Sequence, residues 1–344
     1  MKIVADAHIP YIRGLLEPYA DVSYIPGRDI GPGDVADADA LLIRTRTRCD
    51  AKLLAGSKVR FIGTATIGTD HIDLAYCRDN GIEVVSAAGC NARGVLQWVG
   101  AALALLAQKG GWRPQGKTLG VVGVGHVGSL IKESASVWGF RVLCSDPPRE
   151  TAESLGAAEG FVPLAEIASH ADIVTFHTPL TKDGNHPTWH LGDKDFLKTL
   201  KPRAAVINSA RGNIVDENAL KKVIAEKGIT VCIDTWAGEP DIDRALLAVA
   251  FIATPHTAGY TIQGKANASA TVVDALAAHF RLPLTGWHPP EEKPRPYAVP
   301  IAWEEMGATI KRYCDLETET ATLKKDPESF EAVRDCYPYR EEYF

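Results

Sequence analysis

Short β-rich runs alternate with helical stretches over most of the 344-residue chain, and this alternation is what most constrains the fold. The runs predicted as strands are residues 2–5, 40–43, 61–64, 83–86, 118–122, 141–145, 173–176, 205–208, 230–233 and 251–253. Between them the apolar spacing changes to that of helices, as in residues 92–108 and 127–138. A return from one parallel strand to the next needs a crossover, usually a helix, so the pattern predicts an α/β fold.

The end of the chain has a different composition. Residues 288–296 include four prolines together with acidic and basic side chains, which is typical of a linker or an extended arm. Helical patterns follow at residues 303–313 and 327–336. This stretch is too short to bury much of a core of its own. We therefore expect a tail that docks on the body of the protein or on a second subunit.

Composition excludes several classes of function. The chain has 37 basic and 43 acidic side chains, a net charge of −6, which argues against nucleic acid or an anionic membrane as partner. The longest nearly apolar run, residues 95–107, is shorter than the roughly 20 residues that span a bilayer. The seven scattered cysteines form no C-x-x-C pair, so neither a disulfide framework nor a metal site is expected. Asp6 comes too early for the apolar stretch of a signal peptide. Together these features predict a cytoplasmic protein.

A glycine-rich segment at residues 123–128 directly follows the predicted strand 118–122 and opens a predicted helix. In this context the first glycine permits a tight turn, the second admits a pyrophosphate to the backbone, and the third allows close packing of the helix. The N-terminus of the helix favours the phosphate charge. The predicted cofactor loop comprises Gly123, Gly125, His126, Val127 and Gly128. The alternative is a glycine turn in an unrelated α/β protein.

An acidic residue at the end of the next strand extends this prediction. Asp146 lies 23 residues after Gly123. Its carboxylate would accept hydrogen bonds from the ribose hydroxyls and repel a 2′-phosphate, which favours NAD over NADP. Arg149 is expected to be solvated or to touch the adenine.

Three later strands are followed by reactive side chains. Ser209, Ala210 and Arg211 follow one strand, Asp234 and then Glu239 follow the next, and His256 follows the last. Ligands of an open α/β sheet lie beyond the carboxyl ends of its strands. We therefore expect Arg211, Glu239 and His256 to converge beside a nicotinamide.

These residue types suit the oxidation of an alcohol next to a carboxylate. His256 would take the hydroxyl proton, and Glu239 on the other imidazole nitrogen would fix the tautomer. Arg211 would orient a carboxylate or carbonyl oxygen, and Asp234 would face the nicotinamide carboxamide. Taken singly, each residue has an ordinary alternative. His256 could be a histidine of a turn, Glu239 could begin a helix, and Arg211 could pair with Asp216.

A basic segment is a candidate phosphate site and in that way supports a phosphorylated substrate. Residues 44–48 read Arg-Thr-Arg-Thr-Arg after the strand 40–43, and in an extended segment the arginines would share one face. The threonines would share the other face, and three cations with two hydroxyls suit a phosphate dianion, with Arg44 and Thr45 as the candidates. From these residues alone a solvated basic loop is the favoured alternative. The glycine-flanked turn 63–68 offers backbone amides that suit the substrate carboxylate, with Thr66 as the candidate residue; the alternative is an ordinary tight glycine turn.

The glycine loop with Arg211, Glu239 and His256 resembles the D-isomer-specific 2-hydroxyacid dehydrogenases. The resemblance is nearly continuous from Lys2 to about Gly286, and residues 255–260 are similar to a member that acts on a phosphorylated four-carbon acid. It implies NAD-dependent oxidation of a small phosphorylated 2-hydroxy acid. His256 would be the proton donor or acceptor, with Arg211 and Glu239 in the active site.

The resemblance also implies an architecture of two Rossmann-like, doubly wound domains. Residues 1–90 and 258–287 would form a discontinuous, flavodoxin-like substrate-binding domain, residues 91–257 the NAD-binding domain, and residues 288–344 a shortened C-terminal extension that serves a homodimer. The residues implied to contact NAD are Asp146, Thr175, Ser209, Ala210, Asp234 and Gly259, and those implied to contact substrate are Thr45, Thr66 and Tyr260. Thr45 stands where the family has serine, and Ala88 where it has proline.

Two alternative functions remain open at this stage. A phosphoglycerate or hydroxypyruvate reductase would share the catalytic residues. A regulator that binds NAD without catalysis would share the fold, although the complete set of Arg211, Glu239 and His256 argues against it.

Overall fold

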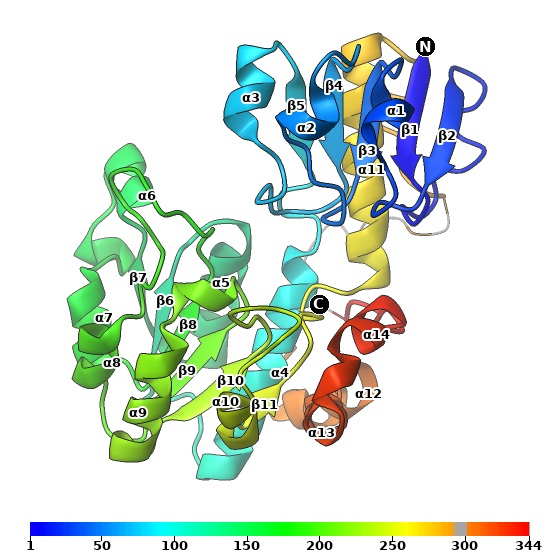
Figure 1. The fold of residues 1–344 in the computed structure, drawn as a ribbon. Helices are drawn as coiled ribbons and strands as arrows, with labels where there is room; N and C mark the ends of the chain where they lie inside the picture. Colours follow the sequence, from blue (N-terminus) through cyan, green and yellow to red (C-terminus); the bar gives the residue numbers. More distant parts are fainter. Residues whose placement is uncertain (291, 293–300, 344) are drawn as a thin grey trace. The chain divides into compact units, whose positions relative to one another are not determined.

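A computed structural model describes residues 1–290, 292 and 301–343, and the chain divides into two compact units (Figure 1). Unit 1 consists of Met1–Asn91 and Thr261–Pro296, and unit 2 consists of Ala92–Tyr260 and Tyr297–Phe344. Each unit contains one parallel sheet with helices on both faces, so the predicted α/β fold class is confirmed. None of the helices in the described residues is long and apolar enough to cross a membrane.

Unit 1 contains a five-stranded sheet in the order β2-β1-β3-β4-β5, with every neighbouring pair parallel. Its strands are β1 (Lys2–Asp6), β2 (Asp21–Ile25), β3 (Ala40–Ile43), β4 (Phe61–Thr64) and β5 (Glu83–Ser86). The long helix α11 (Ile262–Phe280) buries its apolar side against one face. The short helices α1 (Pro32–Val35), α2 (Ala51–Leu54) and α3 (Leu74–Asp79) cover the other. This strand order is that of flavodoxin-like sheets.

Unit 2 contains a six-stranded parallel sheet in the order β11-β10-β9-β8-β6-β7. Its strands are β6 (Thr118–Val122), β7 (Arg141–Ser145), β8 (Ile173–Phe176), β9 (Ala205–Asn208), β10 (Thr230–Ile233) and β11 (Ile252–Ala253). The strand order reverses between β6 and β8, which is the point where ligands bind in doubly wound sheets.

Helices cover both faces of the second sheet. The helices α4 (Ala92–Gly110) and α5 (His126–Trp138) pack on one face. The other face is covered by α7 (Leu164–His170), α8 (Lys194–Thr199), α9 (Glu217–Lys227) and α10 (Arg244–Val249), while α6 (Pro147–Glu153) follows β7. The nearly apolar run predicted as a buried helix is the centre of α4, where Leu96, Trp98 and Leu103 are fully buried.

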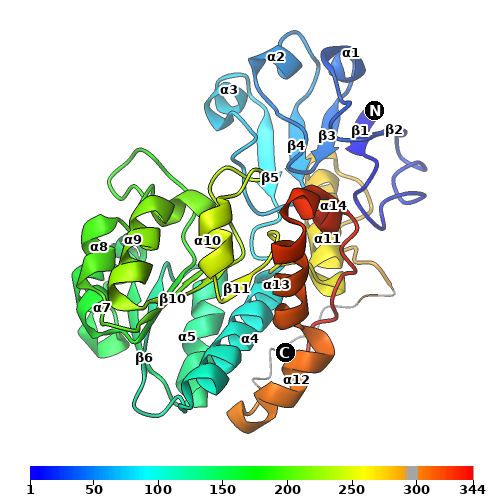
Figure 2. The same cartoon turned by 60° about the horizontal axis from the view of Figure 1, so that its bottom comes forward.

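The C-terminal segment packs on unit 2. Its helices are α12 (Met306–Tyr313), α13 (Leu316–Lys325) and α14 (Phe330–Asp335). Figure 2 shows α12 and α13 beside α4 and β11. Met306 and Leu316 join the core of α4, and Leu323 and Phe330 join the core on the opposite face. Of the predicted linker 288–296, residues 291 and 293–296 lie outside the described part of the chain.

The structure adds elements that the sequence patterns did not predict. Strand β2 lies at the edge of its sheet and four of its five residues are half-buried, so it lacks the apolar run of a central strand. Helix α13 consists mostly of polar residues and is capped at its N-terminus by Asp315, whose carboxylate accepts from the Thr318 amide. The predicted helices at 303–313 and 327–336 are shorter than expected, because each begins with a 3₁₀ turn.

Candidate active site

The loop between β6 and α5 has the geometry that the glycine pattern predicted. Gly123 has a φ of +85°, a left-handed conformation that glycine adopts without strain. A Cβ on Gly128 would lie 2.0 Å from the carbonyl oxygen of Gly123, so only glycine lets α5 start this close to the strand. A Cβ on Gly125 would meet no described atom within 4 Å. The loop therefore leaves open space at the positive end of α5, which fits a pyrophosphate.

Asp146, directly after β7, is tied to the same loop. Its carboxylate accepts from the amides of Val124 at 2.8 Å and Arg149 at 3.1 Å. The expectation that the Arg149 side chain is solvated is wrong, because its Nη1 donates to the Val124 carbonyl at 2.6 Å and to Ser129 Oγ at 2.9 Å. A contact with adenine stays a prediction. Asp146 and Arg149 thus bond the amide and the carbonyl of Val124 in the glycine loop, and Arg149 is already engaged by protein acceptors.

Buried hydroxyl groups without partners lie after three neighbouring strands. Thr178 Oγ1, Ser209 Oγ and Thr235 Oγ1 have no hydrogen-bond partner among the described residues. Buried hydroxyls are rarely left in this state, so these atoms fit the polar groups of a bound dinucleotide. Thr175, by contrast, lies 2.8 Å from His177 Nε2, and burial lowers the pKa of His177 to about 3.

Asp234, at the end of β10, fixes the segment that carries the candidate base. Its Oδ1 accepts from Thr254 Oγ1 at 2.6 Å and from the amides of Thr257 and Ala258 at 2.8 and 3.1 Å. The side chain is buried, and burial raises the pKa of its carboxyl group. The loop that follows β11 is therefore anchored immediately on either side of His256.

His256 and Glu239 form a direct pair. His256 Nδ1 lies 2.8 Å from Glu239 Oε2, while Glu239 Oε1 accepts from the Trp236 amide at 2.8 Å. Burial alone would raise the pKa of Glu239, but the neighbouring His256 and the Trp236 amide outweigh it and bring that pKa below its usual value. Because Nδ1 faces the carboxylate, Nε2 is the nitrogen left for a substrate.

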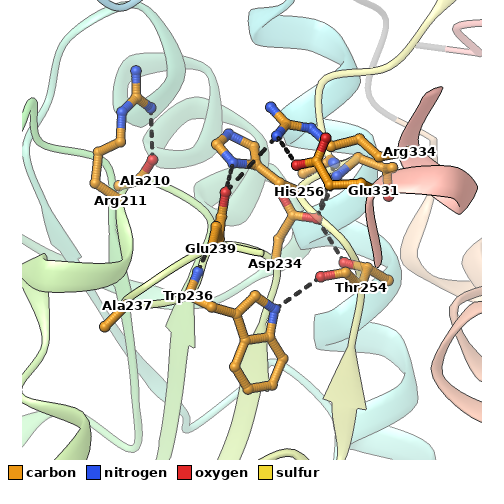
Figure 3. A network of polar contacts seen from close by, with 12 residues as sticks. Ala210, Arg211, Asp234, Trp236, Ala237, Glu239, Thr254, His256, Glu331 and Arg334 are labelled. Atoms are coloured by element: carbon orange, nitrogen blue, oxygen red, sulfur yellow. Dashed lines mark hydrogen bonds and ion pairs between the residues drawn. The ribbon is translucent and has the colours of Figure 1, made fainter. Parts of the chain in front are cut away.

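Arg211 is brought to this pair by a close approach between two loops. A Cβ on Gly212 would lie 1.9 Å from the carbonyl carbon of Trp236, so the loop after β9 touches the loop that carries Glu239. Arg211 Nη1 donates to the Ala210 carbonyl at 2.7 Å. Figure 3 shows Arg211, Glu239 and His256 gathered beyond the strands, which is the convergence expected from the sequence.

Each candidate substrate residue belongs to one of the two compact units. In unit 1, Thr66 Oγ1 lies 2.7 Å from Thr64 Oγ1, and Thr45 is exposed. Tyr260 belongs to unit 2, and Gly259 precedes it in the same loop. The contacts of these residues with a substrate or cofactor stay predictions.

The extended face of arginines expected at residues 44–48 is absent. The Thr47 amide donates to the Arg44 carbonyl at 3.3 Å, so the segment turns instead of alternating. Arg44 Nε donates to the buried Asp6 carboxylate at 2.9 Å, and Thr47 Oγ1 donates to the Gly27 carbonyl at 2.9 Å. These two anchors favour the turn over an extended chain.

Sequence patterns missed one residue at the site, Arg334 of α14. Its Nε donates to the Tyr260 hydroxyl at 3.1 Å, and its Nη1 lies 4.0 Å from the Glu239 oxygen that faces His256. Arg334 follows no strand and belongs to no motif, so only the docking of the C-terminal segment brings it here.

The last residues of the chain also brace the loop after His256. Arg340 Nη2 donates to the Ala258 carbonyl at 2.6 Å, and its amide donates to the Tyr260 carbonyl at 3.1 Å. Tyr337 donates to Glu319 at 2.7 Å and accepts from Arg340 at 2.6 Å. This buried network connects the C-terminal segment to the backbone of residues 258–260.

Known proteins resemble this chain over its whole length. The model of the D-isomer specific 2-hydroxyacid dehydrogenase NAD-binding domain matches residues 97–258. An erythronate-4-phosphate dehydrogenase of Bacteroides fragilis is 44% identical over 344 residues, covering 99% of this chain and 97% of that protein. One from an Enterobacter species is 38% identical, covering 100% and 92%.

Solved structures give the same result for the fold. An NAD⁺-bound 3-phosphoglycerate dehydrogenase of Entamoeba histolytica has a TM-score of 0.69 at 25% identity, covering 83% of this chain and 98% of that one. The family model and the NAD-bound neighbour support NAD as the cofactor. The chain belongs to the D-isomer specific 2-hydroxyacid dehydrogenases, in the branch of the erythronate-4-phosphate dehydrogenases.

Proposed function

We propose that the protein oxidises 4-phospho-D-erythronate to (R)-3-hydroxy-2-oxo-4-phosphooxybutanoate with NAD⁺, as a step in pyridoxal 5′-phosphate (vitamin B6) biosynthesis. The observation that carries the proposal is the His256–Glu239 pair, joined at 2.8 Å, in a chain that matches erythronate-4-phosphate dehydrogenases over nearly its full length.

In this mechanism His256 accepts the proton of the C2 hydroxyl at Nε2. A bound NAD⁺ would supply the hydride acceptor for C2, so that loss of the hydride and the hydroxyl proton would convert the alcohol to a keto group. His256 is suited to this step because Nδ1 is held by Glu239, which leaves the lone pair of Nε2 for the hydroxyl. In the reducing direction the same nitrogen returns the proton.

Glu239 and Arg211 support the proton transfer in different ways. The pKa of Glu239 is lowered, so the group carries a negative charge that stabilises the imidazolium formed when His256 takes the proton. Arg211 presents a planar donor that suits the substrate carboxylate and the developing C2 oxygen. Arg211 and Glu239 are therefore assigned to the active site with His256.

We assign NAD to unit 2. The open space at Gly125 and the orphan hydroxyls of Ser209 and Thr235 support this assignment. The predicted NAD contacts are Gly123, Gly125, His126, Val127, Gly128, Asp146, Thr175, Ser209, Ala210, Asp234 and Gly259. The predicted substrate contacts are Arg44, Thr45, Thr66 and Tyr260.

The cellular setting follows from the same family. We propose a cytoplasmic enzyme that works as a homodimer, with the segment from residue 288 onward contributing to the dimer. The measurement that tests the dimer is the mass in solution by light scattering.

The substrate assignment is tested in the reducing direction, because the equilibrium near neutral pH favours the hydroxy acid. NADH consumption is followed with 3-hydroxy-2-oxo-4-phosphooxybutanoate, its unphosphorylated counterpart and phosphohydroxypyruvate. A preference for the phosphorylated four-carbon keto acid supports the proposal. A preference for phosphohydroxypyruvate moves the enzyme to serine metabolism, and NAD binding without turnover of any keto acid would indicate a regulator.

A further inference from the structure

Arg334 brings a second guanidinium group to the catalytic pair. It comes from α14, in a part of the chain far from the nucleotide loop in sequence. Its Nη1 lies 4.0 Å from Glu239 Oε2, the oxygen that is 2.8 Å from His256 Nδ1. Its side chain is 14% exposed, so the group is largely enclosed but still accessible.

Most of the donors of this guanidinium are unused. Nε donates to the Tyr260 hydroxyl, but the carboxylates of Glu239 and Glu331 lie 4.0 and 3.6 Å from Nη1, beyond hydrogen-bond distance. Nη2 donates to no acceptor among the described residues. The two carboxylates hold the charge in place without occupying its hydrogens, so Nη1 and Nη2 can bind an anion side by side.

The arrangement of the two arginines matches a substrate with two anionic ends. Figure 3 shows Arg211 and Arg334 on opposite sides of the His256 ring. The proposed substrate carries a carboxylate next to the reacting C2 and a phosphate on C4. A substrate with C2 at His256 and its carboxylate on Arg211 would have the other side of the His256 ring, where Arg334 lies, for the rest of its carbon chain.

The arginine that the sequence favoured for the phosphate is less available. Arg44 donates from Nε at 2.9 Å to Asp6, whose side chain is fully buried, so part of its charge is neutralised within its own unit. Arg48 pairs in the same way with Asp50 at 3.0 Å. Arg334 has no contact with a carboxylate as short as these.

We propose that Arg334 is a specificity-determining residue that binds the phosphate group of the substrate from the C-terminal segment. This inference rests on the proposed function, since it needs a phosphorylated hydroxy acid. Tyr260, held by Nε of the same guanidinium, forms the other wall of this phosphate site. The C-terminal segment then contributes to substrate selection.

The test compares Arg334→Gln with wild-type enzyme on the phosphorylated four-carbon keto acid and on its unphosphorylated counterpart. We expect kcat/KM for the phosphorylated compound to fall about 10- to 100-fold, the range for a lost hydrogen bond to a charged group, and that for the other compound to stay within about threefold. Arg244→Gln is the matched control, because Arg244 also ties the C-terminal segment, through Glu328, but lies outside the catalytic pair.

A second measurement uses inorganic phosphate as a competitive inhibitor. Wild-type enzyme should be inhibited, Arg334→Lys less strongly, and Arg334→Gln least. An equal loss for both keto acids would overturn the inference, because Arg334 would then only position Tyr260 or Glu239. Unchanged kinetics would overturn it as well. If the wild-type enzyme shows no preference for the phosphorylated compound, the proposed function is contradicted. The inference about Arg334 is then overturned too, because it needs a phosphorylated substrate.

Discussion

Two glycines of the nucleotide loop have different roles: one is required for folding and the other for cofactor binding. Gly125 and Gly128 lie three residues apart, but a methyl group would meet different surroundings at each. At Gly128 it would lie 2.0 Å from a backbone oxygen, about 1 Å closer than Cβ contacts in proteins approach. At Gly125 it would meet no described atom within 4 Å. The substitutions Gly128→Ala and Gly125→Ala should therefore fail in opposite ways.

The expected magnitudes follow from these contacts. Overpacking costs about 1–3 kcal/mol, and a backbone neighbour cannot rotate away, so Gly128→Ala belongs at the upper end. The better helix propensity of alanine returns up to about 1 kcal/mol. We expect Gly128→Ala to lower the free energy of unfolding by about 2 kcal/mol. Gly125→Ala, at the start of α5, should lower it by less than about 1 kcal/mol.

For NAD affinity, Gly125→Ala should be the substitution with the direct effect. The methyl group of Gly125→Ala fills the space intended for the pyrophosphate, and we expect the Kd for NAD to rise at least tenfold, about 1.4 kcal/mol. Urea unfolding and calorimetric titration with NAD measure the two quantities on the same samples. Wild-type NAD affinity in Gly125→Ala would refute the placement of the pyrophosphate on this loop. Wild-type stability in Gly128→Ala would refute the tight contact between the helix and Gly123.

Three further predictions concern single side chains. His256→Asn should keep NAD affinity and lose about 10²- to 10⁴-fold in kcat, because the proton acceptor is gone; titration and steady-state rates measure the two effects. Asp146→Ala should weaken NAD and reduce the preference over NADP, measured as the ratio of the two Kd values. Burial raises the pKa of Glu217 to about 7, so this group favours folding when protonated, and its contribution is lost as pH rises from about 4.5 through 7. The stability of wild type relative to Glu217→Gln should therefore fall over that window, by urea unfolding at several pH values.

Each of these predictions has a clear contrary result. Normal turnover by His256→Asn would remove His256 as the base. An unchanged cofactor ratio in Asp146→Ala would mean that Asp146 serves only the Val124 and Arg149 amides. A stability difference that does not vary with pH would contradict the raised pKa of Glu217.

The part of the site built on strand ends was predictable from the sequence. Parallel strands deliver the residues after their carboxyl ends to one edge, so Arg211, Glu239 and His256 could be brought together without knowing the loops between them. The glycine loop was predictable for a similar reason, because its spacing is set by one strand, one turn and one helix.

The other parts of the site depended on tertiary contacts, which leave no periodic pattern in the sequence. The turn at residues 44–47 is set by Asp6 and Gly27, which lie far away in sequence, and not by the alternation of arginine and threonine. Arg334 reaches the site because Leu323 and Phe330 bury their side chains in the core of unit 2. A short helix with mixed composition gives no indication of the surface on which it docks.

The network around Arg340 has a consequence for the making of the protein. A ribosome delivers the loop of His256 about 80 residues before Arg340, whose side chain and amide later hold the carbonyls of Ala258 and Tyr260. During synthesis the catalytic loop therefore exists without its brace. The loop is braced only after Arg340 has been synthesised, so a shorter chain that has already folded its nucleotide-binding sheet should bind cofactor before it can turn over substrate.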